Sequence, residues 1–236
     1  MEECAMKKEF PNKNFQRIEA GHGFEISLIR SDSFEVTVDA SEDGFRNIEI
    51  KQEGDKLWLM YSPSIFSLKN LLPGWYLPRA TVKMPRLGGL YINGATRAKL
   101  EGFDSNGKLE IKLSGASQLE GEVKAGEAEI KAEAASEVRL KGVFKKLKLE
   151  LESGSKVQME GWTEELEAEA IGVSQIALDK MVCKQAKVKL ENASQAELRV
   201  EEVLNVKLNG ASELKYAGSP CFNDVEIKGS SSLSKS

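Results

Sequence analysis

The residue types that most often carry chemistry are few in this chain and widely spaced. Its single histidine, His22, stands between two glycines, and its three cysteines are Cys4, Cys183 and Cys221. This composition excludes most His-based catalysis, a His-rich metal site, a Cys-x-x-Cys motif and a disulfide framework. We interpret the cysteines as buried or merely tolerated thiols and His22 as a turn residue. The alternatives are a lipid-anchor cysteine at Cys4 and pH sensing by His22.

Carboxylates could support cleavage of polysaccharides, which needs clustered acids on one face, often with bound calcium. The repeat region holds only Asp104, Asp179 and Asp224, which fall at unrelated repeat positions. Glutamates are plentiful, so a site built from Glu stays open. Phosphate-cradling glycine loops and a Gly-x-Ser-x-Gly motif are absent. We therefore predict no catalytic residue, no cofactor and no metal, with a polysaccharide-active enzyme as the alternative.

Hydroxyl side chains recur at regular spacing, each as the third residue of a tripeptide such as Gly-Ala-Ser. Successive hydroxyl residues are about 19 positions apart. Stacked hydroxyls could form a ligand-binding ladder, or a structural stack satisfied by backbone groups at a corner of the chain. We call these eight residues the hydroxyl ladder; they are Thr96, Ser117, Ser136, Ser155, Ser174, Ser194, Ser212 and Ser231.

The residues around each hydroxyl alternate between apolar and charged with a period of two. Leu149 and Leu151 precede Ser155, for example, and Val157 follows it. Period two is typical of strands and excludes an amphipathic helix, which would need a period of 3.6. A 19-residue repeat of two or three short strands fits one coil of a parallel β-helix. A second group of glycines predicts another corner: Gly102, Gly121, Gly142, Gly161 and Gly218.

The chain divides by pattern into a tail at 1–14, a strand-rich part at 15–80 that lacks the tripeptide, and the repeats at 81–236. We expect one continuous unit, in which the strand-rich part forms irregular opening coils or a small sheet that closes the rod. Residues 62–78 form a long apolar loop, which could cover the rod, form an oligomer interface or stack sugars on Trp75 and Tyr76. Its apolar residues are Ile65, Phe66, Leu68, Leu71, Leu72, Trp75, Tyr76 and Leu77.

Several segments, together with the repeats, carry a resemblance to a known family. They are the strands at 15–20 and 23–28, the Gly-Asp-Lys-Leu-Trp-Leu turn at 54–59 and the strand at 82–87. Over about residues 15–233 the chain resembles the putative auto-transporter adhesin, head GIN domain family. The resemblance implies a bacterial, right-handed parallel β-helix, secreted or lipid-anchored at the cell envelope. It implies no catalytic residues, because none are recognised for that family.

Composition narrows the classes of partner. The net charge is −4, from 33 Lys and Arg against 37 Asp and Glu, which gives no electrostatic basis for binding nucleic acid. No apolar run approaches the ~20 residues of a membrane span, and no signal peptide is recognisable, so the chain as written would be cytoplasmic. The resemblance instead implies the cell envelope or the extracellular space.

The function that these observations favour is a non-enzymatic structural or adhesin-like surface module. It would bind a protein, a glycan or a second copy of itself through a face of the solenoid. The alternatives are a polysaccharide-active β-helix enzyme and a cytoplasmic self-associating β-helix scaffold.

Overall fold

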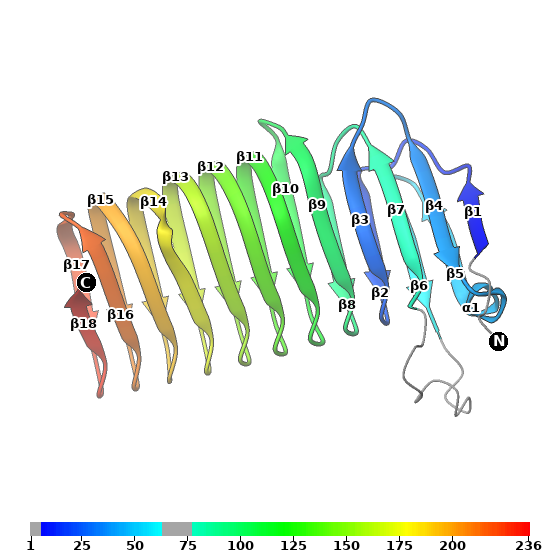
Figure 1. The fold of residues 1–236 in the computed structure, drawn as a ribbon. Helices are drawn as coiled ribbons and strands as arrows, with labels where there is room; N and C mark the ends of the chain where they lie inside the picture. The colour runs from blue at the N-terminus through cyan, green and yellow to red at the C-terminus, as the bar shows by residue number, and fades with distance from the viewer. Residues whose placement is uncertain (1–5, 63–76) are drawn as a thin grey trace.

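The computed structural model describes residues 6–62 and 77–236, which form 18 strands in one continuous arrangement and a single short helix (Figure 1). The N-terminal elements are β1 (Met6–Phe10), β2 (Arg17–Gly21), β3 (Glu25–Arg30), β4 (Glu35–Ala40), α1 (Glu42–Arg46), β5 (Ile48–Glu53), β6 (Lys56–Tyr61) and β7 (Arg79–Met84). The next are β8 (Gly89–Asn93), β9 (Arg97–Asp104), β10 (Lys108–Leu113), β11 (Gln118–Ala132), β12 (Glu137–Leu151) and β13 (Lys156–Ala170). The last are β14 (Gln175–Leu190), β15 (Gln195–Leu208), β16 (Glu213–Gly218), β17 (Cys221–Ile227) and β18 (Ser232–Lys235).

Each coil of the chain contributes one strand to each of two parallel faces. The long strands pass around the bend between them: residues 118–124 of β11 pair with β9, and residues 127–132 pair with β10. We call the face that precedes each tripeptide the first face and the face that follows it the second face. The first face runs β6-β2-β8-β10 and ends at β17, whereas the second runs β7-β3-β9 and ends at β16 and β18. The parallel β-helix predicted from the repeat is confirmed.

Aliphatic side chains from both faces meet inside the rod. In β12, Val138, Leu140 and Phe144 point inward from the second face, and Leu147 and Leu149 point inward from the first, each at most 2% exposed. Fully burying a side chain of this size contributes about 1.5–3 kcal/mol, so the stacked rungs supply most of the driving force for folding. One continuous core extends from Phe15 to Leu214.

The tripeptides form the tight corners along the lower edge of the rod in Figure 1. Ala95, Ala116 and Ala135 have φ between 60° and 62°, a left-handed conformation that closes the turn. Neighbouring corners are joined by hydrogen bonds, since Ala116 N donates to Ala134 O at 2.9 Å. Small residues suit this position because the next coil lies directly against it.

Most of the second group of glycines do not lie at the other corner as predicted; Gly218, the last residue of β16, is the exception. Gly121, Gly142 and Gly161 lie inside β11, β12 and β13. The bend comes after them, where two successive exposed residues, Lys145 and Lys146 in β12, interrupt the alternation. These glycines instead allow close contact between coils, since a Cβ on Gly161 would lie 2.0 Å from Gly142 O.

The N-terminal part both extends and closes the rod. The coil formed by β2 and β3 lies between the β6–β7 coil and the β8–β9 coil, so the chain steps over it on the way to the repeats. Beyond these coils, β1, β4 and β5 pair antiparallel with their neighbours. Ser41 caps α1, because its Oγ accepts a hydrogen bond from Gly44 N at 3.0 Å. The N-terminal strands thus form both stacked parallel coils and an antiparallel cover at the end of the rod.

Candidate functional site

The hydroxyl ladder lies at the corners, turned into the rod. Seven of its eight members are at most 1% exposed, and Ser231 is half-buried. Each of the seven donates its hydroxyl hydrogen to the carbonyl oxygen three residues earlier, at 2.6 Å for Thr96 and at 2.7–2.9 Å for the six serines. Ser212 N donates in turn to Ser231 Oγ at 3.2 Å. A hydroxyl has one hydrogen to donate, so these seven donors serve the backbone of the corner.

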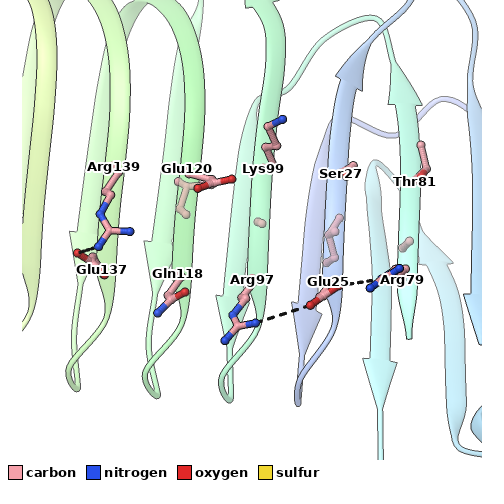
Figure 2. Close-up of a pocket in the computed structure, with 14 residues that line it drawn as sticks. Glu25, Ser27, Arg79, Thr81, Arg97, Lys99, Gln118, Glu120, Glu137 and Arg139 are labelled. Carbon is pink, nitrogen blue, oxygen red and sulfur yellow. Dashed lines mark hydrogen bonds and ion pairs between the residues drawn. The ribbon is translucent and has the colours of Figure 1, made fainter. Parts of the chain in front are cut away.

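An open groove lies on the outer side of the second face, across β7, β3, β9, β11 and β12 (Figure 2). Its volume is about 400 Å³. Two rows of outward-facing side chains, set by the parallel register, line it. The first row is Arg79, Glu25, Arg97, Gln118 and Glu137. The second row is Thr81, Ser27, Lys99, Glu120 and Arg139. We call these ten residues the outer groove.

Strand alternation explains which residues enter the outer groove. Thr96 is buried at the corner, so Arg97 points outward and Ala98, 4% exposed, points inward. Ser27 and Thr81 are short, whereas Arg79 and Lys99 beside them are long. The surface is therefore hollow over β3 and β7 and is bordered by long cationic side chains.

Arginine is concentrated in the outer groove. Glu25 links two of its arginines, with Oε2 2.9 Å from Arg79 Nε and Oε1 3.7 Å from an Arg97 terminal nitrogen. Glu137 lies 2.6 Å from Arg139 in the same way (Figure 2). The groove holds three of the chain's eight arginines, which are Arg17, Arg30, Arg46, Arg79, Arg86, Arg97, Arg139 and Arg199.

These ion pairs are open to exchange. The side chains of Arg79, Arg97 and Arg139 are 58–62% exposed, and exposed ion pairs contribute little to stability. Lys99 lies 2.8 Å from Glu101, and this hydrogen bond is the main reason that the pKa of Lys99 is raised. An anionic ligand could replace the internal carboxylates at small cost.

The outer groove continues along the rod. A second hollow of about 610 Å³ shares Lys99, Glu120 and Arg139 with it and extends to Gln158 and Glu160 on β13. The two hollows together follow the rod axis over several coils, which suits an extended ligand better than a compact one.

The other residues singled out from the sequence lie apart from the outer groove. Of the apolar loop, Ile65, Phe66, Leu68, Leu71, Leu72, Trp75 and Tyr76 lie outside the described residues. Leu77 is half-buried near Gly23. His22 has φ 65° and lies at the corner between β2 and β3, where its N–H donates to Asn93 O at 3.1 Å.

The cysteines differ in environment. Cys183 is fully buried, which raises the pKa of its thiol to about 12, and Cys221 is exposed on β17. Cys4 lies outside the described residues. Within residues 6–62 and 77–236, no group of three or more His, Cys, Asp or Glu side chains could hold a metal ion. None of the helical structure in the described part of the chain is long and apolar enough to cross a membrane.

Sequence reasoning did not find the outer groove. The outward positions of Arg97 and Arg139 follow from the tripeptides before them, and this signal was available. The contributions of Glu25, Ser27, Arg79 and Thr81 were not accessible, because they depend on how the N-terminal coils stack on β9.

Taken together, the stacked coils, the closed N-terminal end and the outer groove define a parallel β-solenoid with an open, charged groove along one face. The chain belongs to the family described as putative auto-transporter adhesin, head GIN domain, which matches residues 14–220. No curated protein matches it.

Solved structures share the whole fold. A putative lipid binding protein from Parabacteroides distasonis is 19% identical with a TM-score of 0.88, covering 98% of this chain and 96% of that one. A putative adhesin from Parabacteroides merdae is 11% identical with a TM-score of 0.89, over the same shares of the two chains. A putative adhesin from P. distasonis is 12% identical with a TM-score of 0.89, covering 100% and 98%. Identities this low show the fold alone.

Proposed function

We propose that this protein is a non-enzymatic, adhesin-like module of the cell envelope or extracellular space. It binds a carboxylate-bearing polysaccharide along the outer groove. The family described as putative auto-transporter adhesin supports the general role, and the groove supports the class of ligand.

The observation that carries this proposal is the spacing of the three arginines. Arg79 and Arg97 are separated by the Glu25 strand, and Arg97 and Arg139 lie two strands apart, across β11. Along the rod axis each interval is about 9–10 Å, twice the distance between neighbouring strands. Arg139 is also offset from Arg97 by two residues along the strand direction, because it lies in the second row. A guanidinium group donates two parallel hydrogen bonds to a carboxylate. Arginines that recur at every second strand along a rod therefore suit a polymer whose carboxylates recur along its length.

The remaining residues of the outer groove suit a sugar more than a lipid. Ser27, Thr81 and Gln118 offer hydroxyl and amide groups, and the apolar side chains of the same strands point into the core. Their polar groups can hydrogen-bond to sugar hydroxyls, whereas an acyl chain needs an apolar lining. One relative is named a putative lipid binding protein; the charged lining here favours a glycan for this chain.

The same groove favours binding over cleavage. Of the three glutamates of the outer groove, Glu25 and Glu137 pair with arginines, which leaves only Glu120 outside these ion pairs. A glycosidase needs two carboxylates free to act on one glycosidic bond.

The test is a calorimetric titration of the protein with polygalacturonate, with neutral dextran and dextran sulfate in parallel. We expect polygalacturonate to bind, dextran not to bind, and the affinity for polygalacturonate to fall as salt is added. The double variant Arg97→Gln/Arg139→Gln should lose at least tenfold in affinity. The matched control Arg46→Gln/Arg199→Gln removes the same charge outside the groove and should bind like the wild type.

Three results would contradict the proposal. Equal loss in both double variants would indicate a nonspecific charge effect, and binding of dextran sulfate as tight as that of polygalacturonate would indicate recognition of negative charge in general and not of carboxylates. Shortening of polygalacturonate by the wild type with calcium supplied would replace a binding module with an enzyme.

A further inference from the structure

The C-terminal end of the rod exposes residues that belong to the core. Five large apolar side chains of the described chain are exposed, and three of them lie on β17: Phe222 at 40%, Val225 at 46% and Ile227 at 44%. We call these three residues the end patch. Tyr216 packs edge-on against Phe222 with ring centroids 5.3 Å apart.

The register identifies the end patch as an uncovered rung. Phe222 pairs with Leu204, Val225 with Val206 and Ile227 with Leu208, which are all at most 1% exposed. The side chains of β15 are buried because β17 covers them. Those of β17 are exposed because, within the described residues, no strand follows β17 on the first face, and none follows β18 on the second. These two strands therefore also present unpaired backbone groups, which favour pairing with a further strand.

The N-terminal end of the rod, unlike the C-terminal end, is covered by antiparallel strands and a short helix. There, β1 and β5 pair antiparallel with β4 and β6, and α1 lies beside them (Figure 1). The middle of β1 is exposed and charged, with Lys8 Nζ 4.2 Å from the Phe45 ring centroid. A parallel rung cannot continue onto this end, so head-to-tail stacking is disfavoured. The end patch can instead be covered by an identical end, which gives a closed two-fold pair.

The sequence of β17 is complementary to itself in the antiparallel direction. With Glu226 on the two-fold axis, Val225 faces Ile227 of the second copy, and Asp224 faces Lys228 of the second copy. Each of these contacts occurs twice. Opposite charges and aliphatic pairs across antiparallel strands both stabilise pairing. The two Glu226 side chains face each other, but each already has an ion pair with Lys228 and lies 3.8 Å from Lys207.

We propose that the protein forms a two-fold dimer through its C-terminal end, with β17 pairing antiparallel to β17 of a second copy. The irregular register between Leu204 and Val206 limits the regular pairing to residues 224–228, so the dimer is reversible. The inference does not depend on the outer groove.

Sedimentation velocity of the full chain over a wide concentration range tests association. We expect the mass of the main species to double as concentration rises, with no species beyond the dimer. Val225→Glu should remain monomeric with an unchanged circular dichroism spectrum, because residue 225 is already exposed in the monomer. A wild type that stays monomeric, a Val225→Glu variant that dimerises equally, or growth beyond the dimer would each overturn the proposal.

Crosslinking tests the register directly. In a Cys4→Ser/Cys221→Ser background, Glu226→Cys brings two thiols together across the axis, at a distance that allows a disulfide. We expect Glu226→Cys to form a covalent dimer under mild oxidation and the exposed control Lys215→Cys to form none. Equal crosslinking by both variants would overturn the register. Binding of polygalacturonate by Val225→Glu should be unaffected, which separates failure of the dimer from failure of the groove.

Discussion

Glu150 lies opposite Lys131 in the register of the first face, with its Oε2 2.5 Å from the Lys131 Nζ. Its other carboxylate oxygen lies 2.5 Å from Lys148 Nζ. These two ammonium groups hold the pKa of Glu150 below its ordinary value of 4.5. In the next coil, Glu169 pairs in register with Glu150, and Lys189 lies 2.7 Å from Glu169. The like-charged neighbours in this row are thus each offset by a nearby cation.

The lowered pKa of Glu150 predicts a dependence of stability on acid. The ionised carboxylate stabilises the folded state, so its contribution is present above pH 4.5 and is lost as the pH falls through the lowered value. Glu150→Gln should cost about 0.5–1 kcal/mol at neutral pH, and the difference from the wild type should vanish in acid. Urea unfolding at a series of pH values measures this. Glu152→Gln, at an exposed neighbouring position, should stay close to the wild type throughout, and a Glu150→Gln deficit that persists in acid would contradict the assignment.

The hydroxyl ladder predicts a cost for removing a single hydroxyl. Ser136 Oγ donates to Glu133 O at 2.7 Å and is 1% exposed. Ser136→Ala leaves that carbonyl without its partner, so we expect a loss of about 1–2 kcal/mol in the free energy of unfolding. Ser136→Thr should retain most of the stability, because Thr96 fills the same position in another coil. The exposed control Ser234→Ala should change stability by less than about 0.5 kcal/mol, and an equal effect of the two alanine variants would refute a structural role.

Two glycines with positive φ predict different costs for the same substitution. A Cβ on Gly161 would lie 2.0 Å from Gly142 O, whereas a Cβ on Gly154 would meet nothing within 4 Å. Gly154→Ala should therefore lower the free energy of unfolding only by the strain of a left-handed backbone conformation, about 1–2 kcal/mol. Gly161→Ala must also separate two coils, and we expect a cost of about 3 kcal/mol or more. Thermal unfolding followed by circular dichroism compares them; similar melting temperatures would show that the coils are not in close contact there.

The two described cysteines predict a count of reactive thiols. Burial raises the pKa of Cys183 to about 12, so its reactive thiolate is scarce at neutral pH and the side chain is out of reach of reagents. In a Cys4→Ser variant, a thiol-specific chromogenic reagent should therefore titrate one thiol in the native protein, that of exposed Cys221, and two after unfolding. Rapid reaction of both thiols in the native protein would show that the core around Cys183 opens readily.

The repeats could be predicted from sequence because the residues that determine each corner and its flanking strands are close together in the chain. The tripeptides fixed the corners, and alternation around Ser155 or Ser136 fixed which side chains point inward. The second glycine group was misassigned because a glycine at a close backbone contact, such as Gly161, has the same composition signal as one at a turn.

The N-terminal stacking order and the outer groove could not be predicted in the same way. The insertion of the β2–β3 coil between two later coils depends on pairing between distant segments that carry no tripeptide. Four of the ten residues of the outer groove come from those segments, so Glu25 and Arg79 could not be connected with Arg97 beforehand. The covalent order of the chain does not reveal which coil stacks on which.

The central claim, that the outer groove binds a carboxylate-bearing polymer, is tested most directly by observing the arginine side chains. The Nε–H signals of the eight arginines can be followed by NMR during titration with polygalacturonate. We predict shifts for Arg79, Arg97 and Arg139 and unchanged signals for Arg30, Arg46 and Arg199. Binding that moves the second set and leaves the first unchanged, or no binding at all, would contradict it.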